Sequence, residues 1–286
     1  MSFVDWLVTP FRYPFMVRAL IAAVLVGGIS GIVGSYVVLR SMAFLGDALA
    51  HAVLPGIAAG FLVNGSDNRR ALFWWALGTA IVVALGIESV GRRARIKEDT
   101  AIGILFAGAF ALGIALLSTA RSSSTDLIHF LFGNVLGVSN GDLLLISAFG
   151  GAILFLVLLF YKEFLIVSFD PTLAVTLRLP TALYRYLLLI LVAVTVVVSL
   201  QTVGLGLMLA MLITPATTAY LLTRRLPRMM GLGALLGALS GILGLYLSFH
   251  LGIASGPAIV LVAIGFFLVV LAVGPQSRLI SRIRHR

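Results

Sequence analysis

The chain has 286 residues, of which 61% are hydrophobic and only 10% are charged. Soluble domains carry roughly 25% charged residues, so this composition excludes an ordinary soluble protein and indicates an integral membrane protein. The formal net charge of +10 is then expected to reflect cationic cytoplasmic loops rather than nucleic-acid binding, and the absence of cysteine excludes disulfides and thiolate metal ligands.

Long apolar runs recur along the whole chain, and no alternation of polarity suggests a barrel. We therefore predict an all-α, polytopic membrane helix bundle of eight to nine transmembrane helices, forming a single transmembrane domain over residues 1–286. A span needs about 20 mainly apolar residues. The predicted spans are 17–39, 43–63, 71–90, 100–118, 142–161, 183–200, 202–222, 231–249 and 255–274. Two of them run together at Leu200 and Gln201.

The distribution of Lys and Arg predicts the orientation. With the N-terminus outside and alternating spans, most of the 20 cationic side chains fall on the inner side, as the positive-inside rule requires. The inner residues are Arg40, Arg92, Arg93, Arg95, Lys97, Lys162, Arg178, Arg185, Arg224, Arg225, Arg228, Arg278, Arg282, Arg284 and Arg286. If residues 3–15 form an additional surface element, the N-terminus returns to the cytoplasm and the later loops keep their sides.

Two ionisable side chains, Asp47 and His51, stand four residues apart in an apolar span. At helical spacing they share one face, and a carboxylate with an imidazole suits a divalent transition metal. A charge at bilayer depth costs about 2.5–3.5 kcal/mol or more, so the pair calls for a functional reason. The alternative is structural: Asp47 caps a helix that begins at Ala48 near the inner interface.

Two prolines are predicted to disturb spans. Pro55 lacks an N–H, so the carbonyl of His51 loses its usual helical donor beside the polar pair. Thr214 and Pro215 interrupt another span, where a kink can help to form a gate, although kinks are common in membrane helices.

The inner loop over residues 161–183 differs from the others. Asp170 followed by Pro171 is typical of a helix start, with Asp as the cap and Pro at the first helical position. We expect a short helix that runs to about Leu179 and is ended by Pro180. Such a helix either binds a partner or lies on lipid headgroups.

Other patterns exclude functions or have structural explanations. No P-loop is present, so the chain itself is not expected to bind a nucleotide, and no nucleophile–base pair or metalloprotease motif indicates an enzyme. Asp126 and His129 form a second possible polar pair, for which capping by Asp126 is sufficient. His250 lies at an outer loop. Glycines such as Gly27 and Gly237 are expected to allow close helix packing.

Five segments, in the same order, resemble the permease subunits of bacterial ATP-binding-cassette importers for manganese, zinc and iron. They are RSMAFLGDALAHAVLPG (40–56), KEDTAIG (97–103), DLIHFLFGN (126–134), FYKEF through SFDP (160–171), and VG through AMLITPA (203–216). The resemblance covers about residues 17–275.

This resemblance implies a permease of the bacterial inner (plasma) membrane that works as a homodimer around one pathway. It also implies two partner classes, a cytosolic ATP-binding-cassette ATPase and an extracytoplasmic metal-binding protein, with no role for nucleic acid. Asp47 and His51 become the expected metal contacts, and this outweighs the capping explanation. No cofactor is expected to be permanently bound. ATP acts only through the partner, so this chain is not itself an enzyme.

The resemblance further implies that Phe169, Asp170 and Pro171 belong to a coupling helix, about residues 163–180, that docks on the ATPase. One outer loop departs from the family pattern, with Gly252 where an acid is frequent and Ala254 where proline is frequent. An outer metal contact from this loop is in doubt, although His250 can substitute for the acid.

Alternative functions remain open at this point. One is a proton- or sodium-coupled secondary metal carrier that uses Asp47 as its relay. Another is a chelate or vitamin importer of similar architecture. The transported ion is also open, because one oxygen and one nitrogen ligand per chain suit Mn²⁺, Zn²⁺ or Fe²⁺.

Overall fold

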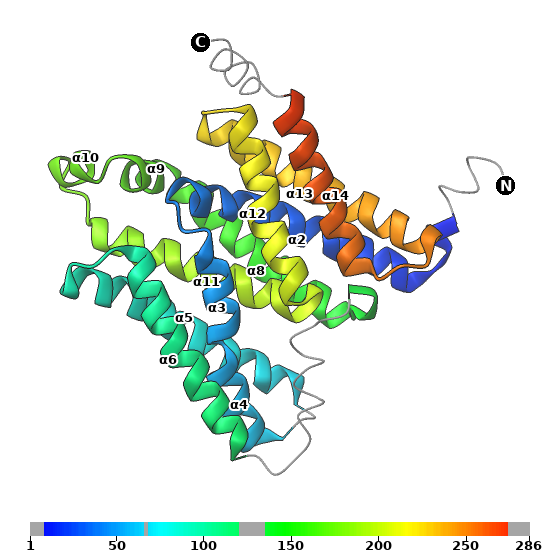
Figure 1. The fold of residues 1–286 in the computed structure, drawn as a ribbon, viewed down its shortest axis with the longest axis horizontal. Coiled ribbons are helices and arrows are strands. Elements are labelled where there is room, and N and C mark those ends of the chain that lie inside the picture. Colours follow the sequence, from blue (N-terminus) through cyan, green and yellow to red (C-terminus); the bar gives the residue numbers. More distant parts are fainter. Residues whose placement is uncertain (1–8, 66–67, 120–134, 274–286) are drawn as a thin grey trace. The chain divides into compact units, whose positions relative to one another are not determined.

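The computed structural model describes residues 9–65, 68–119 and 135–273, and within these ranges the regular secondary structure is entirely helical (Figure 1). In chain order the elements are η1 (Thr9–Arg12), α2 (Pro14–Leu39), α3 (Phe44–Ala52), α4 (Leu54–Asn64), α5 (Arg69–Ala94), α6 (Glu98–Ser118), η2 (Val135–Gly137), α8 (Asn140–Leu159), α9 (Tyr161–Phe169), α10 (Pro171–Thr176), α11 (Thr181–Val203), α12 (Leu205–Leu222), α13 (Leu226–Leu251) and α14 (Ser255–Val273). The predicted all-α class is confirmed for this part of the chain.

Nine helical segments in the described ranges are long and apolar enough to cross a membrane, and α3 with α4 forms one of them. They match the predicted spans, but some begin earlier. α2 begins at Pro14, and α13 begins at Leu226 with Pro227 in its first turn. Proline fits the first turn of a helix because the N–H that it lacks has no intrahelical partner there. These helices therefore extend beyond the apolar stretch that defined the prediction.

One predicted boundary was wrong. α11 and α12 meet at Gly204 and not at Leu200–Gln201. The φ angle of Gly204 is 80°, a conformation that glycine adopts readily and other residues adopt with strain. Because the residues on both sides are apolar, hydropathy carried no signal for this break.

Backbone contacts divide the chain into two compact units. Unit 1 comprises Met1–Val38, Asn134–Gly151 and Thr202–Arg286, and unit 2 comprises Leu39–Gly133 and Ala152–Gln201, with one boundary inside α8. We expect a single transmembrane domain over residues 1–286. Whether the two units associate into one such domain stays a prediction.

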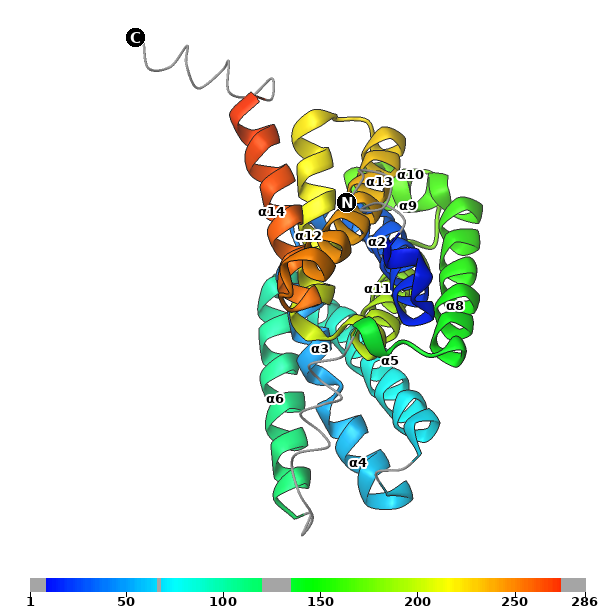
Figure 2. The ribbon, with the colours of Figure 1, turned by 90° about the vertical axis from the view of Figure 1, so that its right-hand side faces the viewer.

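In unit 1, α12, α13 and α14 pack against one another (Figure 2), and α2 meets α13 through glycine. A Cβ atom placed on Gly27 would lie 2.6 Å from the carbonyl carbon and oxygen of Gly237. A Cβ atom on Gly233 would lie 2.9 Å from the carbonyl oxygen of Gly31. The predicted small faces therefore bring two backbones into direct contact, as in other membrane helix pairs.

In unit 2, α4 packs between α5 and α6, and α3 packs on α6 (Figures 1 and 2). Glycine again permits the approach, because a Cβ atom on Gly113 of α6 would lie 2.7 Å from the Cβ of Leu54. Because α3 and α4 both pack on α6, the direction of α3 is fixed relative to α6. This packing thereby sets the position of the polar side chains of α3.

We predict that Gly27→Ala destabilises the protein by roughly 1–3 kcal/mol, the usual cost of overpacking, because the neighbouring atoms belong to backbone and cannot turn away. The matched control is Gly28→Ala, since a Cβ atom there meets no described atom within 4 Å. Thermal unfolding in detergent measures both variants. Equal stability of the two would contradict the close backbone contact.

Candidate functional site

Asp47 and His51 lie together on one face of α3, as the sequence predicts. The Oδ1 atom of Asp47 is 3.5 Å from the Nε2 atom of His51, and the two side chains are 32% and 30% exposed. The pair is thus half-buried, reachable from outside the helix, and offers one oxygen and one nitrogen in adjacent positions. The structure does not support the capping alternative. α3 begins at Phe44, its N-cap is Ala43, and no side chain caps it.

Two aromatic side chains of α6 flank the imidazole of His51. The ring of Phe110 stands perpendicular to it at a centroid distance of 5.7 Å, and the ring of Phe106 lies at 6.0 Å with an interplanar angle of 61°. Phe44 of α3 contacts Phe106 edge-on at 5.8 Å. These edge-to-face contacts restrict rotation of the imidazole and line one side of the pair with apolar surface.

The sequence prediction missed both phenylalanines of α6. Their spacing of four residues places Phe106 and Phe110 on one helix face, which matches the spacing of Asp47 and His51 on α3. That match was the available signal. It was hidden because phenylalanine is common throughout this apolar chain, which contains 18 of them.

The predicted span over residues 43–63 is two helices, α3 and α4, with Pro55 just after the break. α3 ends at Ala52, α4 begins at Leu54, and Pro55 occupies its first turn. The carbonyl of His51 is not left free, because it accepts a hydrogen bond from the Val53 N–H at the helix end. The break lets α3 and α4 take separate directions within one span.

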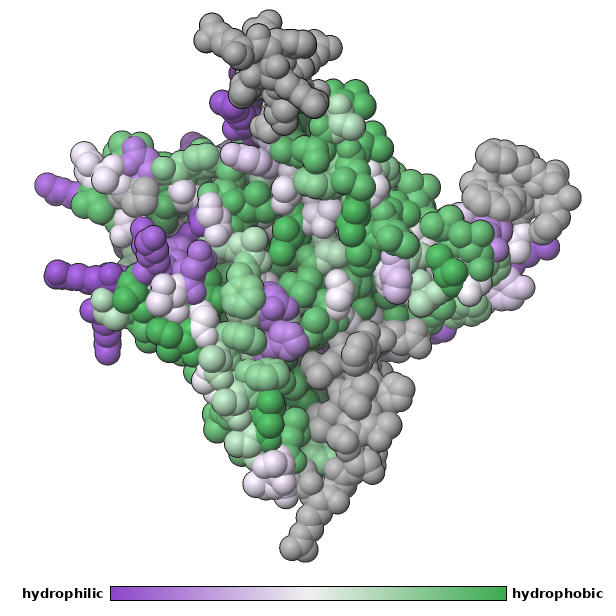
Figure 3. All heavy atoms as spheres, in the orientation of Figure 1, coloured by the Kyte–Doolittle hydropathy of each residue, from purple (hydrophilic) through white to green (hydrophobic). Residues whose placement is uncertain are grey.

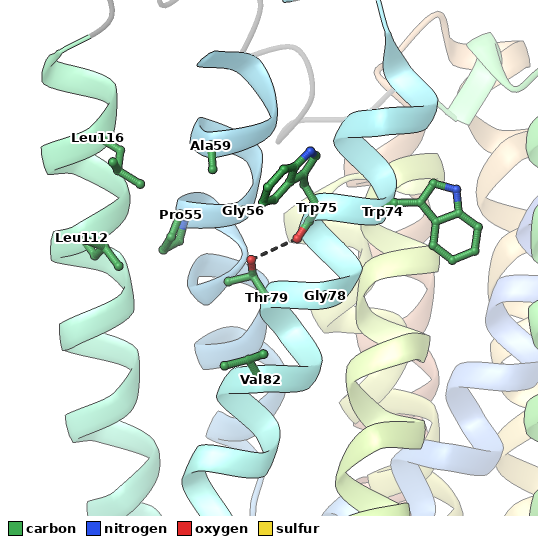
Figure 4. Close-up of a pocket in the computed structure, with 10 residues that line it drawn as sticks. All are labelled: Pro55, Gly56, Ala59, Trp74, Trp75, Gly78, Thr79, Val82, Leu112 and Leu116. Carbon is green, nitrogen blue, oxygen red and sulfur yellow. Dashed lines mark hydrogen bonds between the residues drawn. The ribbon is translucent and has the colours of Figure 1, made fainter. Parts of the chain in front are cut away.

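An apolar groove of about 610 Å³ lies beyond this break, between α4, α5 and α6 (Figure 4). The side chain of Trp75 turns toward α4 whereas that of Trp74 points away, and the Thr79 hydroxyl donates to the Trp75 carbonyl at 3.0 Å. The lining residues are Pro55, Gly56, Ala59, Trp74, Trp75, Gly78, Thr79, Val82, Leu112 and Leu116. None of these carries an ionisable group, so the groove is unsuited to binding a cation.

His250 lies in the last turn of α13, in unit 1, against two aromatic rings. Its centroid is 5.3 Å from that of Phe249 and 6.4 Å from that of Tyr246. The helix ends at Gly252, whose φ angle of 65° is a left-handed conformation that favours glycine. An outer metal contact from His250 stays a prediction.

Thr214 and Pro215 lie inside α12, which continues from Leu205 to Leu222 without a break. The expected interruption of this span is therefore not observed. Hydroxyl groups support the helix around the proline, because Thr217 donates to the Ile213 carbonyl at 2.8 Å and Thr218 donates to the Thr214 carbonyl at 2.7 Å. A gating role for Thr214 and Pro215 stays a prediction.

The helix after α9 begins where the sequence predicts. Asp170 is the N-cap of α10, and its carboxylate accepts hydrogen bonds from the backbone N–H groups of Thr172 at 3.1 Å and Leu173 at 2.9 Å. The Thr172 hydroxyl also donates to this carboxylate. The Thr172 hydroxyl first, and then the Leu173 N–H, hold the pKa of Asp170 below its usual value.

α10 is shorter than predicted, because it ends at Thr176 and not near Leu179. Arg178 adopts a left-handed conformation with a φ angle of 55°, and its N–H donates to the Val175 carbonyl. The Leu179 N–H donates to the Ala174 carbonyl at 3.0 Å. This pair of bonds is the Schellman ending, which closes a helix before Pro180 can do so.

Around α10 the protein surface combines apolar and cationic side chains. Phe169, Leu173, Val175 and Leu177 are between 45% and 66% exposed. Exposed cations of the same unit lie close to α10 in the sequence, at Lys162 and Arg178, and at the end of α5 and just after it, at Arg92, Arg93, Arg95 and Lys97. Figure 3 shows hydrophilic residues on the side of the molecule where Figure 1 draws α10. This charge marks the end of unit 2 predicted to face the cytoplasm.

Among the described residues, no group of three or more His, Cys, Asp or Glu side chains lies close enough to hold a metal ion. The Asp47–His51 pair therefore offers two potential donor atoms in one chain. The other predicted polar pair, Asp126 and His129, lies outside the described residues.

Comparisons with known proteins agree on one family. The sequence profile of the ABC 3 transport family matches residues 12–274 of this chain. The manganese transport system membrane protein MntC of Listeria monocytogenes is 47% identical over 274 residues, which cover 96% of this chain and 96% of that protein. The protein of the same name from Halalkalibacterium halodurans is 44% identical over 270 residues, covering 94% and 91% of the two chains.

A solved structure shares the fold. It is described as PsaBC from Streptococcus pneumoniae in complex with Fab, and the matching chain has a TM-score of 0.82 and 40% sequence identity. The match covers 97% of this chain and 98% of that chain. With nine candidate spans in the described residues, the protein is a multi-pass protein of the bacterial plasma membrane. The chain belongs to the ABC 3 transport family.

Proposed function

We propose that this chain is the membrane-spanning permease subunit of an ATP-driven importer for a divalent transition metal, with Mn²⁺ as its substrate. The Asp47–His51 pair carries the proposal, because it places a carboxylate oxygen 3.5 Å from an imidazole nitrogen on one face of a spanning segment. The names of the relatives, which specify manganese transport, support the choice of ion.

Two ligands hold a metal weakly, and a transport site must release its ion. Mn²⁺ accepts carboxylate and imidazole ligands, and the missing cysteine removes the soft ligands that favour copper. A second copy of the chain would bring another Asp47 and another His51, giving two oxygens and two nitrogens. A homodimer with this face of α3 toward its axis is therefore the assembly that we propose.

The direction of transport requires two further partners. An extracytoplasmic binding protein delivers the ion to the outer side of the permease. Asp47 and His51 then replace part of the water shell of the ion. ATP binding and hydrolysis in a separate cytosolic subunit then switch access from the outer to the inner side. Since this chain has no P-loop, ATP is bound and hydrolysed by the partner subunit in this proposal.

α10 is the proposed contact with the ATPase, together with Phe169 at the end of α9. Its exposed apolar residues, among them Leu173 and Val175, lie beside cationic side chains at the end predicted to face the cytoplasm. Apolar side chains exposed to water favour burial against a partner. A rigid, well-capped α10 presents them in one orientation, so movements of the ATPase can be transmitted to the helices that follow.

The function is tested by uptake of Mn²⁺ into sealed vesicles that contain the permease with or without its ATPase partner. We expect uptake only with both subunits, ATP and the binding protein. Sustained uptake without the ATPase would establish the secondary carrier instead. Competition by a metal chelate, but not by free Mn²⁺, would establish a chelate importer.

We predict that Asp47→Asn and His51→Gln each lower the initial rate of Mn²⁺ uptake by about tenfold or more, since a contact worth roughly 1.4 kcal/mol already gives that factor. Asp142→Asn is the matched control, because Asp142 is a partly exposed acid of unit 1 whose carboxylate accepts a hydrogen bond from the Ser139 N–H at 3.0 Å. Assembly with the ATPase must be unchanged in all variants. Normal transport by both site variants would exclude the assignment.

We predict that Asp170→Ala weakens co-purification with the ATPase, whereas Asp170→Asn retains it, because Asn caps a helix as well as Asp does. A lowered pKa means that the ionised carboxylate stabilises α10 at neutral pH and that this contribution is lost only as the pH falls through the lowered pKa. The difference in stability between the wild type and Asp170→Ala is therefore expected to stay constant from about pH 6 to pH 8. A cap contribution that disappears within this range would contradict the hydrogen bonding described here.

A further inference from the structure

Four charged side chains meet in unit 2, apart from the Asp47–His51 pair. The Nη2 atom of Arg40 donates to Oε1 of Glu98 at 2.6 Å. The Nη1 atom of Arg185 lies 3.9 Å from Oε1 of Glu98 and 3.9 Å from Oε1 of Glu88. Two cations thus face two acids, and Glu98 is the residue that both cations share.

Two members of this cluster are buried, whereas Glu98 is 36% exposed and Arg185 is 28% exposed. The side chain of Arg40 is 6% exposed and that of Glu88 is 3% exposed. Among the described residues, Arg40 Nη1 and Glu88 Oε1 make no hydrogen bond. A buried charge is stable only when its partners stand in good geometry, so a displacement of one member of the cluster destabilises the remaining charges.

Three members of the cluster come from separate elements, each next to a part of the proposed transport machinery. Arg40 lies in the turn just before α3, which carries Asp47 and His51. Glu98 is the first residue of α6, which carries Phe106 and Phe110 against His51. Arg185 lies near the start of α11, the helix that follows α10.

We propose that Glu98 is a positioning residue that links the ATPase-docking helix to the metal-binding pair. Through Arg185 it responds to α11, and through Arg40 it holds the base of α3. This role rests on the proposed function, because it deepens the coupling between α10 and the Asp47–His51 pair.

The distances suit a contact that changes during transport. Arg40 and Glu98 form an ion pair with a short hydrogen bond, whereas Arg185 lies 3.9 Å from each acid and forms ion pairs without a hydrogen bond. Helix shifts of about 1–2 Å are typical of switching proteins. Such a shift of α11 is enough to close the Arg185 contact with one acid and open it with the other. The charge on Arg185, rather than its shape, is then what matters.

The test uses vesicles with the permease, its ATPase and the binding protein, and it measures Mn²⁺ uptake, ATP hydrolysis and the Mn²⁺ concentration for half-maximal rate. We expect Glu98→Gln and Arg185→Gln to raise the ATP hydrolysed per Mn²⁺ transported by about fivefold, the lower end of typical coupling factors. The half-maximal concentration should change less than about twofold, because Asp47 and His51 remain in place. Arg185→Lys, which keeps the charge, and Asp99→Asn, an exposed neighbouring acid, should behave as wild type.

The outcomes separate this inference from the function itself. A wild-type complex that does not import Mn²⁺ contradicts the proposed function. If the wild type imports Mn²⁺ but hydrolysis and transport fall in proportion in Glu98→Gln and Arg185→Gln, the cluster is only structural and the inference is overturned. It is also overturned if Arg185→Lys behaves like Arg185→Gln. If Glu98→Gln does not assemble, the comparison of the two Arg185 variants decides alone.

Discussion

The proposed transport pathway depends on two ionisable side chains held together inside a membrane-spanning segment. Asp47 and His51 lie 3.5 Å apart, half-buried, in a chain of which 61% is hydrophobic. Each such group is costly at bilayer depth, and in the proposed function a dication bound between the carboxylate and the imidazole would compensate for that cost. Two ligands from one chain suit a transport pathway, because the ion must also be released.

The surrounding helices of unit 2 maintain this arrangement. Gly113 allows α6 to approach Leu54 closely, and this contact brings Phe106 and Phe110 against the imidazole of His51. The rings limit the orientations of the imidazole and exclude water from one side. At the other end of α3, Arg40 binds Glu98 of α6. α3 and α6 are therefore held to each other at both ends of α3, which fixes the position of Asp47 and His51.

Much of this could be predicted from the sequence, because its strongest signals are local. Spans follow from hydropathy, and the start of α10 follows from Asp170 and Pro171, whose effects extend over only a few residues. The break at Gly204 could not be predicted, because it depends on a backbone angle within an apolar run. The contacts of His51 with Phe106 and of Arg40 with Glu98 join distant segments. The spacing of Phe106 and Phe110 places them on one helix face, but it does not show which helix that face meets.

Pulsed electron paramagnetic resonance of Mn²⁺ bound to the purified permease tests the central claim most directly. Coupling between the Mn²⁺ electron spin and a histidine nitrogen reports an imidazole ligand. The account predicts this coupling in the wild type, its loss in His51→Gln, and its retention in His250→Gln. Coupling that persists in His51→Gln, or that is absent from the wild type with Mn²⁺ bound, would contradict it.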